Sequence, residues 1–259
     1  MGEEVGTTRM KGLVAAIGLV AIWQVVVWST GAPPFLLPAP ARTAMALWRD
    51  ADILAGHALI TAAEIASGLI LGTLIGVLTA IGLALAPRVR PWLLPVLVAS
   101  QAVPVFAIAP LLVLWLGFGM ASKVVMAALI IFFPVASAFY DGLRRAEPGW
   151  LDLAQTMGAT RGAVLWRIQA PAALPALASG LRVAAAVAPI GAVVGEWVGA
   201  SAGLGYLMLH ANGRSQTDLM FAALLVLAAI SLTLWFALDA LLRRMIPWQA
   251  DTLTEGHRP

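Results

Sequence analysis

Residues 57–86, HALITAAEIASGLILGTLIGVLTAIGLALA, decide the class of fold. The only charged side chain in this run of 30 residues is Glu64, and ~20 apolar residues are enough for a helix to cross a bilayer. Gly68, Gly72 and Gly76 recur at a spacing of four, so one face of the helix is bare backbone. Since such a face lets another helix approach closely, the stretch predicts a transmembrane helix inside a bundle.

The composition of the whole chain agrees with this interpretation. Of its 259 residues, 61% are hydrophobic and 11% are charged, and the mean hydropathy is +0.91. An ordinary soluble domain is only about 45–50% apolar and about 25% charged. A soluble globule is therefore excluded, and much of the apolar surface must face lipid. Cysteine is absent, which excludes disulfides, thiolate metal sites and cysteine nucleophiles.

Five further apolar stretches bring the number of expected transmembrane helices to six. The sequence thus predicts an all-α, polytopic membrane protein that forms a single domain, residues 1–259. A cleaved signal peptide is the alternative for the first stretch, but its apolar region is typically ~7–15 residues. Residues 31–54 are expected to form a proline-rich loop and an amphipathic helix at the membrane surface. The spans are expected at Gly12–Thr30, His57–Ala86, Pro91–Gly119, Ser122–Tyr140, Ser179–Ala200 and Leu219–Leu242.

Prolines interrupt the third stretch and predict that it is broken rather than straight. A broken span is found where its freed carbonyls line a cavity or meet neighbouring helices. We therefore take Ser100, Gln101 and Pro104 as candidates for a translocation pathway, with a packing kink and helix-to-helix hydrogen bonds as the alternative. The prolines are Pro91, Pro95, Pro104 and Pro110.

The basic residues fix the orientation. With both termini in the cytoplasm, eleven lysines and arginines fall inside and four fall outside, namely Arg42, Arg49, Lys123 and Arg214. The remaining one, Arg182, falls at the inner end of the fifth span. This asymmetry follows the positive-inside rule. The net charge of +3 is thus explained by lipid and topology, and we expect no nucleic-acid partner.

The longest inner connection, residues 141–178, is expected to fold. Its apolar residues have helical spacing, Gly158 interrupts them, and Pro171 and Pro175 are expected to stop the second of two short helices. Two helices meeting at Gly158 would form a protrusion into the cytoplasm. Docking of a partner there is favoured over a purely structural loop.

The residues of this loop resemble the EAA loop of bacterial ABC importer permeases. The spacing of the motif is kept throughout, whereas aspartate and leucine replace its usual glutamate and first alanine. The resemblance implies contact with an ATPase subunit through Asp152, Leu153, Ala154, Gly158, Ile168 and Pro171.

The resemblance extends over residues 35–248 and includes APLLVLWLGFG at 109–119 and GEWVGASAGLGYL at 195–207. These segments are similar to permeases of the nitrate, sulfonate and taurine branch, and PIGAVVGEWV at 189–198 is similar to thiamine-precursor and riboflavin members. The family implies a type I ABC importer permease fold, a homodimer in the bacterial plasma membrane, two cytoplasmic ATPase subunits and an extracytoplasmic solute-binding protein.

The chain itself lacks an ATPase motif and is expected to be no enzyme, with no catalytic residue, metal or cofactor. A P-loop needs glycine before its lysine, but Lys11 follows Met10 and Lys123 follows Ser122. ATP hydrolysis is thus assigned to the separate subunit, and this chain is assigned the path of a small organic solute.

Glu196 is the strongest candidate for a functional acidic residue within a span, since burying an acid in the membrane is costly and such residues are usually functional. Its position near the outer end of its helix allows either a side chain that reaches out to water or one that lines the outer end of the pathway. Glu64 and Asp239 lie nearer span ends, where solvated side chains are expected.

Two other function classes remain as alternatives. Gly199, Ser201 and Gly203 satisfy G-x-S-x-G, but a serine protease needs a histidine within reach, and none is expected inside a span. An ion-coupled transporter would show an inverted repeat or mid-span charges. The few basic residues along the spans favour a neutral or weakly charged ring compound, such as a pyrimidine thiamine precursor, over taurine, a sulfonate or nitrate.

Overall fold

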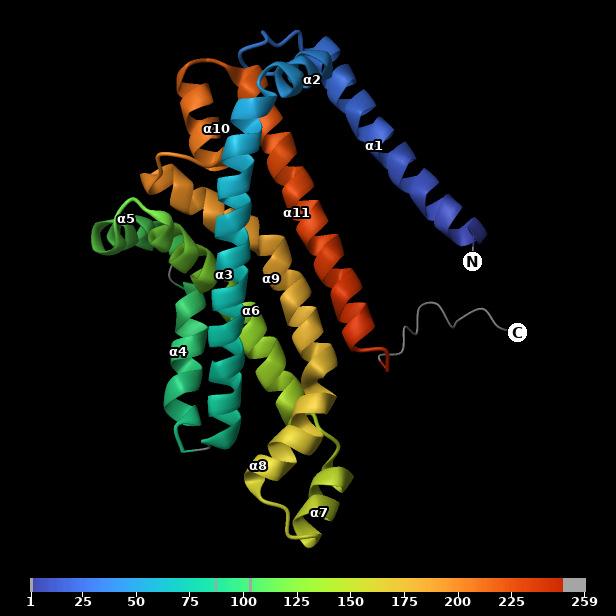
Figure 1. Cartoon of the computed structure of the whole chain (residues 1–259), viewed down its shortest axis with the longest axis vertical. Coiled ribbons are helices and arrows are strands. Elements are labelled where there is room, and N and C mark those ends of the chain that lie inside the picture. Colours follow the sequence, from blue (N-terminus) through green and yellow to red (C-terminus); the bar gives the residue numbers. More distant parts are fainter. Residues whose placement is uncertain (1, 87, 103, 249–259) are drawn as a thin grey trace.

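The computed structural model describes residues 2–86, 88–102 and 104–248, and all regular structure within these ranges is helical (Figure 1). The expected all-α fold is confirmed. The elements are α1 Gly2–Thr30, α2 Pro40–Arg49, α3 Ala51–Leu85, α4 Arg90–Ala102, α5 Val105–Leu116, α6 Met120–Arg144, α7 Pro148–Thr156, α8 Arg161–Val164, the π-helical η1 Leu165–Gln169, α9 Ala170–Gly199, α10 Leu204–Gly213 and α11 Thr217–Met245.

The centre of the molecule consists of α3, α6 and α9, which pack through small residues. A Cβ atom added at Gly72 would lie 2.8 Å from Cβ of Ile131, and one added at Gly191 would lie 2.6 Å from Cα of Ala127. The two glycines therefore let α3 and α9 approach α6 from two sides, as expected for the glycine face of residues 57–86.

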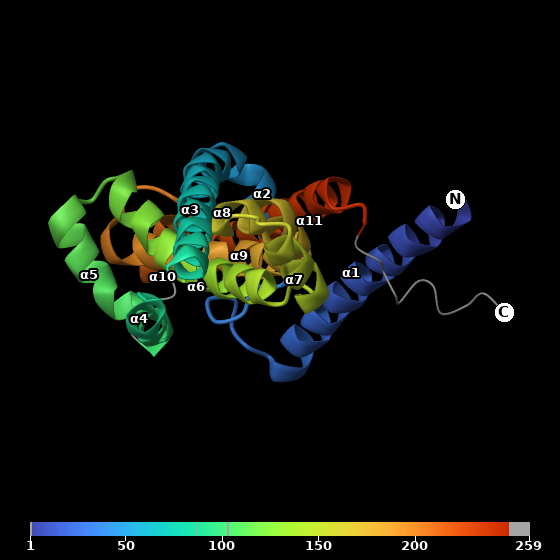
Figure 2. The ribbon, with the colours of Figure 1, turned by 90° about the horizontal axis from the view of Figure 1, so that it is seen from below.

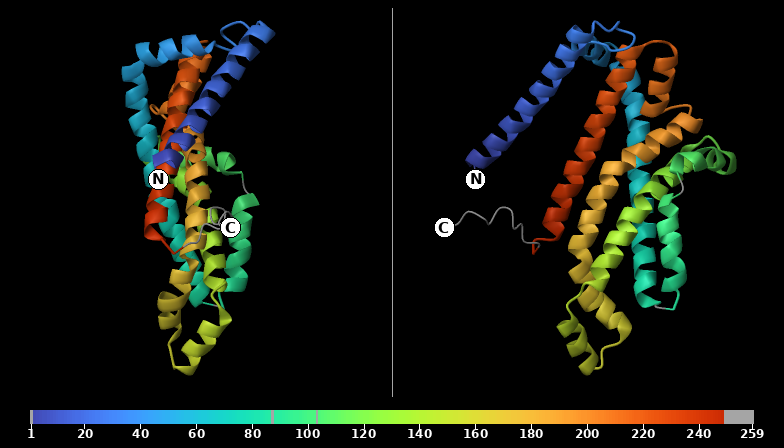
Figure 3. Two further views of the ribbon diagram at one scale, coloured as in Figure 1. Left: turned by 90° about the vertical axis from the view of Figure 1, so that its right-hand side faces the viewer. Right: turned by 180° about the vertical axis from the view of Figure 1, so that it is seen from behind.

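Four helical segments are long and apolar enough to cross a membrane: α3, α6, the continuous segment Arg161–Gly199 and α11. The pair α4 and α5 gives a fifth if it counts as one broken span. The apolar part of α1, Val14–Thr30, is shorter, and Figures 1 and 3 show this helix leaving the bundle towards its N-terminus. The six-span prediction therefore depends on α1.

The third stretch is broken, as its prolines predict. The helical parts Arg90–Gln101 of α4 and Val105–Leu116 of α5 lie at an angle of 97° to each other. Pro104 directly precedes α5 in an extended conformation, which suits a residue that has no backbone N–H to contribute. Pro95 and Pro110 are accommodated inside the two helices.

The expectation that Pro171 and Pro175 end a short helix is wrong, because α8, η1 and α9 form one continuous helical segment. In η1 the hydrogen-bond register widens, and the N–H of Ala170 donates to the carbonyl of Leu165, five residues earlier. Pro171 follows directly at the start of α9. Since a π turn already interrupts the regular bonding pattern, a residue without N–H is tolerated next to it.

We call the end of the molecule that holds α7 and α8 the inner end and the opposite end the outer end, following the predicted orientation. Seen from below, α7 and α8 cover the inner ends of α6 and α9 (Figure 2). At the outer end, α2 buries Thr43 and Ala46 and exposes Trp48, which confirms the expected amphipathic helix.

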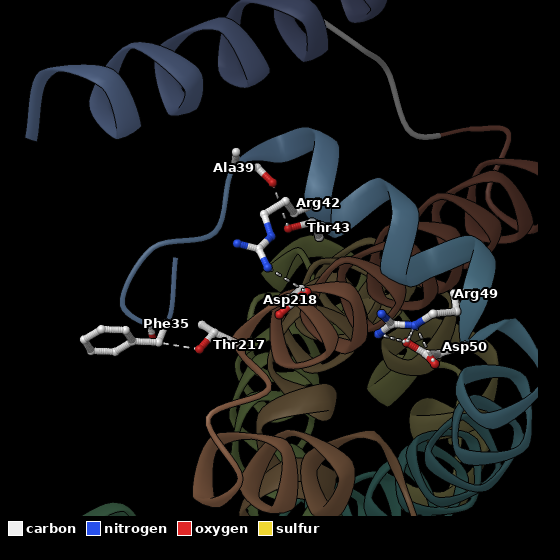
Figure 4. Close-up of polar contacts among 8 residues, drawn as sticks. All are labelled: Phe35, Ala39, Arg42, Thr43, Arg49, Asp50, Thr217 and Asp218. Atoms are coloured by element: carbon white, nitrogen blue, oxygen red, sulfur yellow. Dashed lines mark hydrogen bonds and ion pairs between the residues drawn. The ribbon is translucent and has the colours of Figure 1, made fainter. Parts of the chain in front are cut away.

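Contacts with the start of α11 hold the outer loop and α2 in place (Figure 4). The hydroxyl of Thr217 donates to the carbonyl of Phe35 at 2.7 Å. Arg42 lies 4.0 Å from the carboxylate of Asp218. The first residues of α11 thus fix the position of the segment between α1 and α3.

Candidate functional site

The inner protrusion, residues 148–164, is built from α7, the turn at 157–160 and α8. Gly158 has φ +73°, a conformation that glycine adopts without steric cost. The N–H of Ala159 donates to the carbonyl of Ala154 at 2.9 Å, and Thr160 caps α8 by accepting from the N–H of Ala163 at 3.3 Å. The predicted turn between two helices at Gly158 is therefore confirmed.

The protrusion and the adjoining η1 expose large apolar side chains. Ala154 is buried, but Leu153, Met157 and Trp166 are each more than 60% exposed. Asp152 is exposed beside them. Exposed apolar surface of this kind marks a contact with a partner or with lipid.

A groove of about 830 Å³ runs between the protrusion and the start of α9. It unites residues that are distant in the sequence, and four of the six predicted coupling residues, Leu153, Ala154, Ile168 and Pro171, line it. The other lining residues are Trp150, Met157, Arg167, Ala172, Pro175 and Trp248. With one arginine among mostly apolar side chains, the groove suits protein contact rather than covalent chemistry.

At the outer end, Glu196 is enclosed by protein and is only 1% exposed. Its Oε1 accepts from the hydroxyl of Thr61 at 2.6 Å, and its Oε2 accepts from the N–H groups of Gly205 and Tyr206. The alternative in which Glu196 reaches out to water is wrong, because α10 folds back over the end of α9. In this conformation the carboxylate does not line an open pathway either.

Thr61 and His57 extend this set of contacts, which we call the outer network: His57, Thr61, Glu196 and residues 203–206. The hydroxyl of Thr61 accepts from the N–H of Leu204 at 2.7 Å, and Nδ1 of His57 accepts from the N–H of Gly203 at 2.9 Å. Sequence reasoning missed Thr61 and His57, since they contact Glu196 and the loop only after folding.

The outer network places His57 near the loop that carries Ser201, but it forms no catalytic pair. Nδ1 of His57 is occupied by the backbone of Gly203. Ser201 is exposed and has no hydrogen bond to a histidine in the part of the chain that the structure describes. G-x-S-x-G is here the turn between α9 and α10.

An outer pocket of about 350 Å³ lies next to this network. Glu64 and Lys123 line it, and each is only 2% exposed, so the expected solvation of Glu64 is wrong. Oε2 of Glu64 has no hydrogen-bond partner among the described residues. Nζ of Lys123 donates to the carbonyls of Phe118 and Gly119. Lys123, which the sequence places outside at a span end, lies in the first turn of α6 and is buried.

The predicted pathway residues Ser100, Gln101 and Pro104 are exposed at the bend between α4 and α5. The hydroxyl of Ser100 donates to the carbonyl of Leu97 at 2.7 Å, within its own helix. None of the three lines the groove of the inner protrusion or the outer pocket. The hydrogen bonds of Glu196 within the described part of the chain are to Thr61, Gly205 and Tyr206, and none of them involves Ser100, Gln101 or Pro104.

Asp239 is also buried rather than solvated, contrary to expectation. Its carboxylate accepts from Arg182 at 2.7 Å and from Arg243 at 2.8 Å. Arg182 comes from α9, and Asp239 and Arg243 come from α11. The ion pair joins the two helices and neutralises Arg182, which the sequence places at the inner end of the fifth expected span.

Comparisons with known proteins agree with this architecture. Residues 72–250 match the family described as "Binding-protein-dependent transport system inner membrane component". The chain is 54% identical to a "Probable ABC transporter permease protein" of Haemophilus influenzae over 92% of this chain and 97% of that protein.

Two further relatives have names that state a solute. The chain is 35% identical to the formylaminopyrimidine transport permease protein ThiX of Halalkalibacterium halodurans, over 89% of this chain and 92% of that one. It is 40% identical to the riboflavin transport system permease protein RibX of Chloroflexus aurantiacus, over 90% and 88%.

The fold is similar to that of a solved chain of the MetNI methionine ABC transporter in inward-facing conformations. The TM-score is 0.65 at 19% identity, over 76% of this chain and 97% of that one. The family match leaves neither the serine protease nor the ion-coupled transporter as an interpretation of the six-span pattern. The chain therefore belongs to the binding-protein-dependent ABC permeases, the inner-membrane components that form a transport path for a small solute while a separate subunit hydrolyses ATP.

Proposed function

We propose that this permease imports a small, flat heteroaromatic solute, such as a pyrimidine precursor of thiamine. The observation that carries the proposal is the similarity over about nine-tenths of the chain to permeases named for formylaminopyrimidine and for riboflavin. Both of these named solutes are nitrogen heterocycles with few or no fixed charges.

The outer pocket supports the same class of solute. Its walls are mostly apolar, and the polar side chains that line it are those of Glu64, Lys123 and Ser201. Ligand pockets typically combine apolar walls with a few polar groups that fix orientation. Lys123 shares the pocket with Glu64, so the site lacks the unbalanced positive charge that would favour nitrate or a sulfonate.

The working unit that we propose is a homodimer with both termini in the cytoplasm, two ATPase subunits at the inner protrusions and a binding protein at the outer face. Leu153, Met157 and Trp166 support the position of the ATPase contact, since they expose apolar surface at the inner end. Asp152, Ala154, Gly158, Ile168 and Pro171 shape or flank this surface.

The outer network would keep the extracellular side closed until the binding protein docks. Its hydrogen bonds join α3, α9 and the start of α10, so they hold these three elements together at the outer end. Transport then follows from a shift between inward-open and outward-open states that ATP and the loaded binding protein stabilise differently.

Uptake competition in cells that carry the whole transporter tests the solute class. Excess hydroxymethylpyrimidine or riboflavin should inhibit uptake of a labelled pyrimidine, and cells lacking the permease provide the control. Inhibition by taurine, alkanesulfonate or nitrate, with none by the ring compounds, would overturn the heteroaromatic proposal and leave the family assignment intact.

A further inference from the structure

Tyr140, near the inner end of α6, has a hydroxyl without a hydrogen-bond partner among the described residues. The residue is 3% exposed, and its Oη is buried. Buried polar groups nearly always have a partner, and an unsatisfied one costs about 1–3 kcal/mol. A hydrogen-bond partner for this hydroxyl would therefore come from a group outside the described part of the chain.

Two arginines lie at the ring of Tyr140. The guanidinium carbons of Arg90, at the start of α4, and Arg144, at the end of α6, are each 5.5 Å from the ring centroid. Neither arginine forms an ion pair within residues 2–86, 88–102 and 104–248. Two positive charges around one ring repel each other, and an anion between them would be stabilised.

The same residues line a cavity of about 280 Å³, which we call the inner arginine pocket. Its polar side chains, those of Arg90, Arg144, Tyr140 and Gln169, can all donate hydrogen bonds. None of its described lining residues is acidic. The remaining walls are apolar and come from Leu83, Ala84 and Leu143.

The position of the pocket favours a ligand that belongs to the membrane. It lies at the inner ends of α3, α4 and α6, where the chain passes from its apolar spans to the basic residues of the cytoplasmic side. Lipid phosphates occupy this level of a bilayer, and basic pockets between helices on the cytoplasmic side bind anionic headgroups. A guanidinium pairs with phosphate through two parallel hydrogen bonds.

We infer that the inner arginine pocket binds a phosphate group, with Arg90 and Arg144 pairing with its oxygens and Tyr140 donating a further hydrogen bond. The phosphate can belong to an anionic phospholipid of the cytoplasmic leaflet or to a free anion. The site is separate from the groove of the inner protrusion, since the two share no lining residue.

Native mass spectrometry of the purified permease in detergent, titrated with phosphatidylglycerol, tests the inference. The double variant Arg90→Gln/Arg144→Gln should bind this lipid at least about tenfold more weakly than the native protein. Arg88→Gln/Arg145→Gln is the matched control, because it removes equal charge from exposed neighbours that do not line the pocket. Its affinity should stay within about twofold of the native value.

Two further arms identify the source of the phosphate and the role of the hydroxyl. Thermal shift with inorganic phosphate, compared with phosphatidylglycerol, separates a free anion from a headgroup, and stabilisation by either supports the phosphate site if it is lost in the pocket variant. Tyr140→Phe should weaken lipid binding severalfold without lowering the melting temperature of the lipid-free protein.

Three results would overturn the inference. One is equal loss of binding in the pocket variant and the control. Another is equal affinity for phosphatidylcholine and phosphatidylglycerol. The third is release of the ATPase subunit from the pocket variant with lipid binding unchanged, since the arginines would then pair with carboxylates of that partner.

Discussion

The hydroxyl of Thr61 lies 2.6 Å from Oε1 of Glu196 and 2.7 Å from the backbone nitrogen of Leu204. It donates to the first and accepts from the second, although 135 residues separate Thr61 from Glu196. One side chain of α3 thus connects the end of α9 to the start of α10.

Replacing Thr61 with valine keeps the shape of the side chain and removes both hydrogen bonds. The carboxylate of Glu196 and the N–H of Leu204 would each lose a buried partner, at a cost of about 1–3 kcal/mol each. We therefore expect a clearly lower melting temperature of the purified permease. Thr233→Val is the control, because the Thr233 hydroxyl is exposed and bonds only within its own helix, to Ala229. Equal melting temperatures for the two variants would mean that the outer network contributes nothing to stability.

Gly158→Val should abolish coupling to the ATPase while leaving the transmembrane part folded. At φ +73° a β-branched side chain is strained, although no atom lies within 4 Å of the added Cβ. Gly158→Asn should retain more activity, since asparagine tolerates this conformation. ATPase activity stimulated by the loaded binding protein in proteoliposomes provides the measurement.

Gly162→Ala is the matched control for this experiment. Gly162 lies in the same protrusion, also has open space around it, and does not have a positive φ. Full activity of Gly158→Val, or loss of activity in Gly162→Ala, would contradict the role of the turn.

Asp239→Asn should destabilise the protein by about 3 kcal/mol, because it leaves Arg182 without its charge partner in a largely buried position. The side chain of Arg182 is 24% exposed and that of Arg243 is 67% exposed. Arg243→Gln should therefore cost less than about 1 kcal/mol. Unfolding of the two variants in detergent provides the comparison. Similar losses of stability would show that the ion pair between Arg182 and Asp239 contributes no more than the exposed pair with Arg243.

Gly72→Leu should prevent stable packing of α3 on α6. Even its first side-chain atom would lie 2.8 Å from Cβ of Ile131 and 2.9 Å from the carbonyl oxygen of Ala128. Gly82→Ala, where no atom lies within 4 Å of the added Cβ, should be tolerated because alanine favours helix. The yield of monodisperse protein after extraction distinguishes the two, and a normal yield for Gly72→Leu would contradict the predicted close approach.

The sequence predicted those features that depend on local pattern. The apolar run of residues 57–86 became α3, the prolines near Pro104 marked a real break, and Gly158 marked a real turn. Each of these follows from the backbone preferences or apolar length of neighbouring residues, which a single chain displays directly.

The errors concern groups whose environment is made by distant segments. Glu196 and Glu64 lie close to span ends, where solvent is the expected surrounding, but α10 and the start of α6 cover them. Asp239 is met by Arg182 from another helix. Position along a span predicts depth in the membrane, whereas burial depends on tertiary packing that the pattern of one helix does not contain.

The unbroken segment from Arg161 to Gly199 has a mechanical consequence. Its 39 residues form one continuous helical segment that contains Pro175 and Pro189, and Ile168 and Glu196 lie about 42 Å apart along the helix at ~1.5 Å per residue. A tilt of about 10° at the inner end of a rigid rod of that length displaces the other end by about 7 Å. That displacement exceeds the reach of any hydrogen bond. A push beneath the protrusion would therefore break the bonds of Glu196 unless the segment bends first, either at η1, where the helical register changes, or at Pro175 or Pro189.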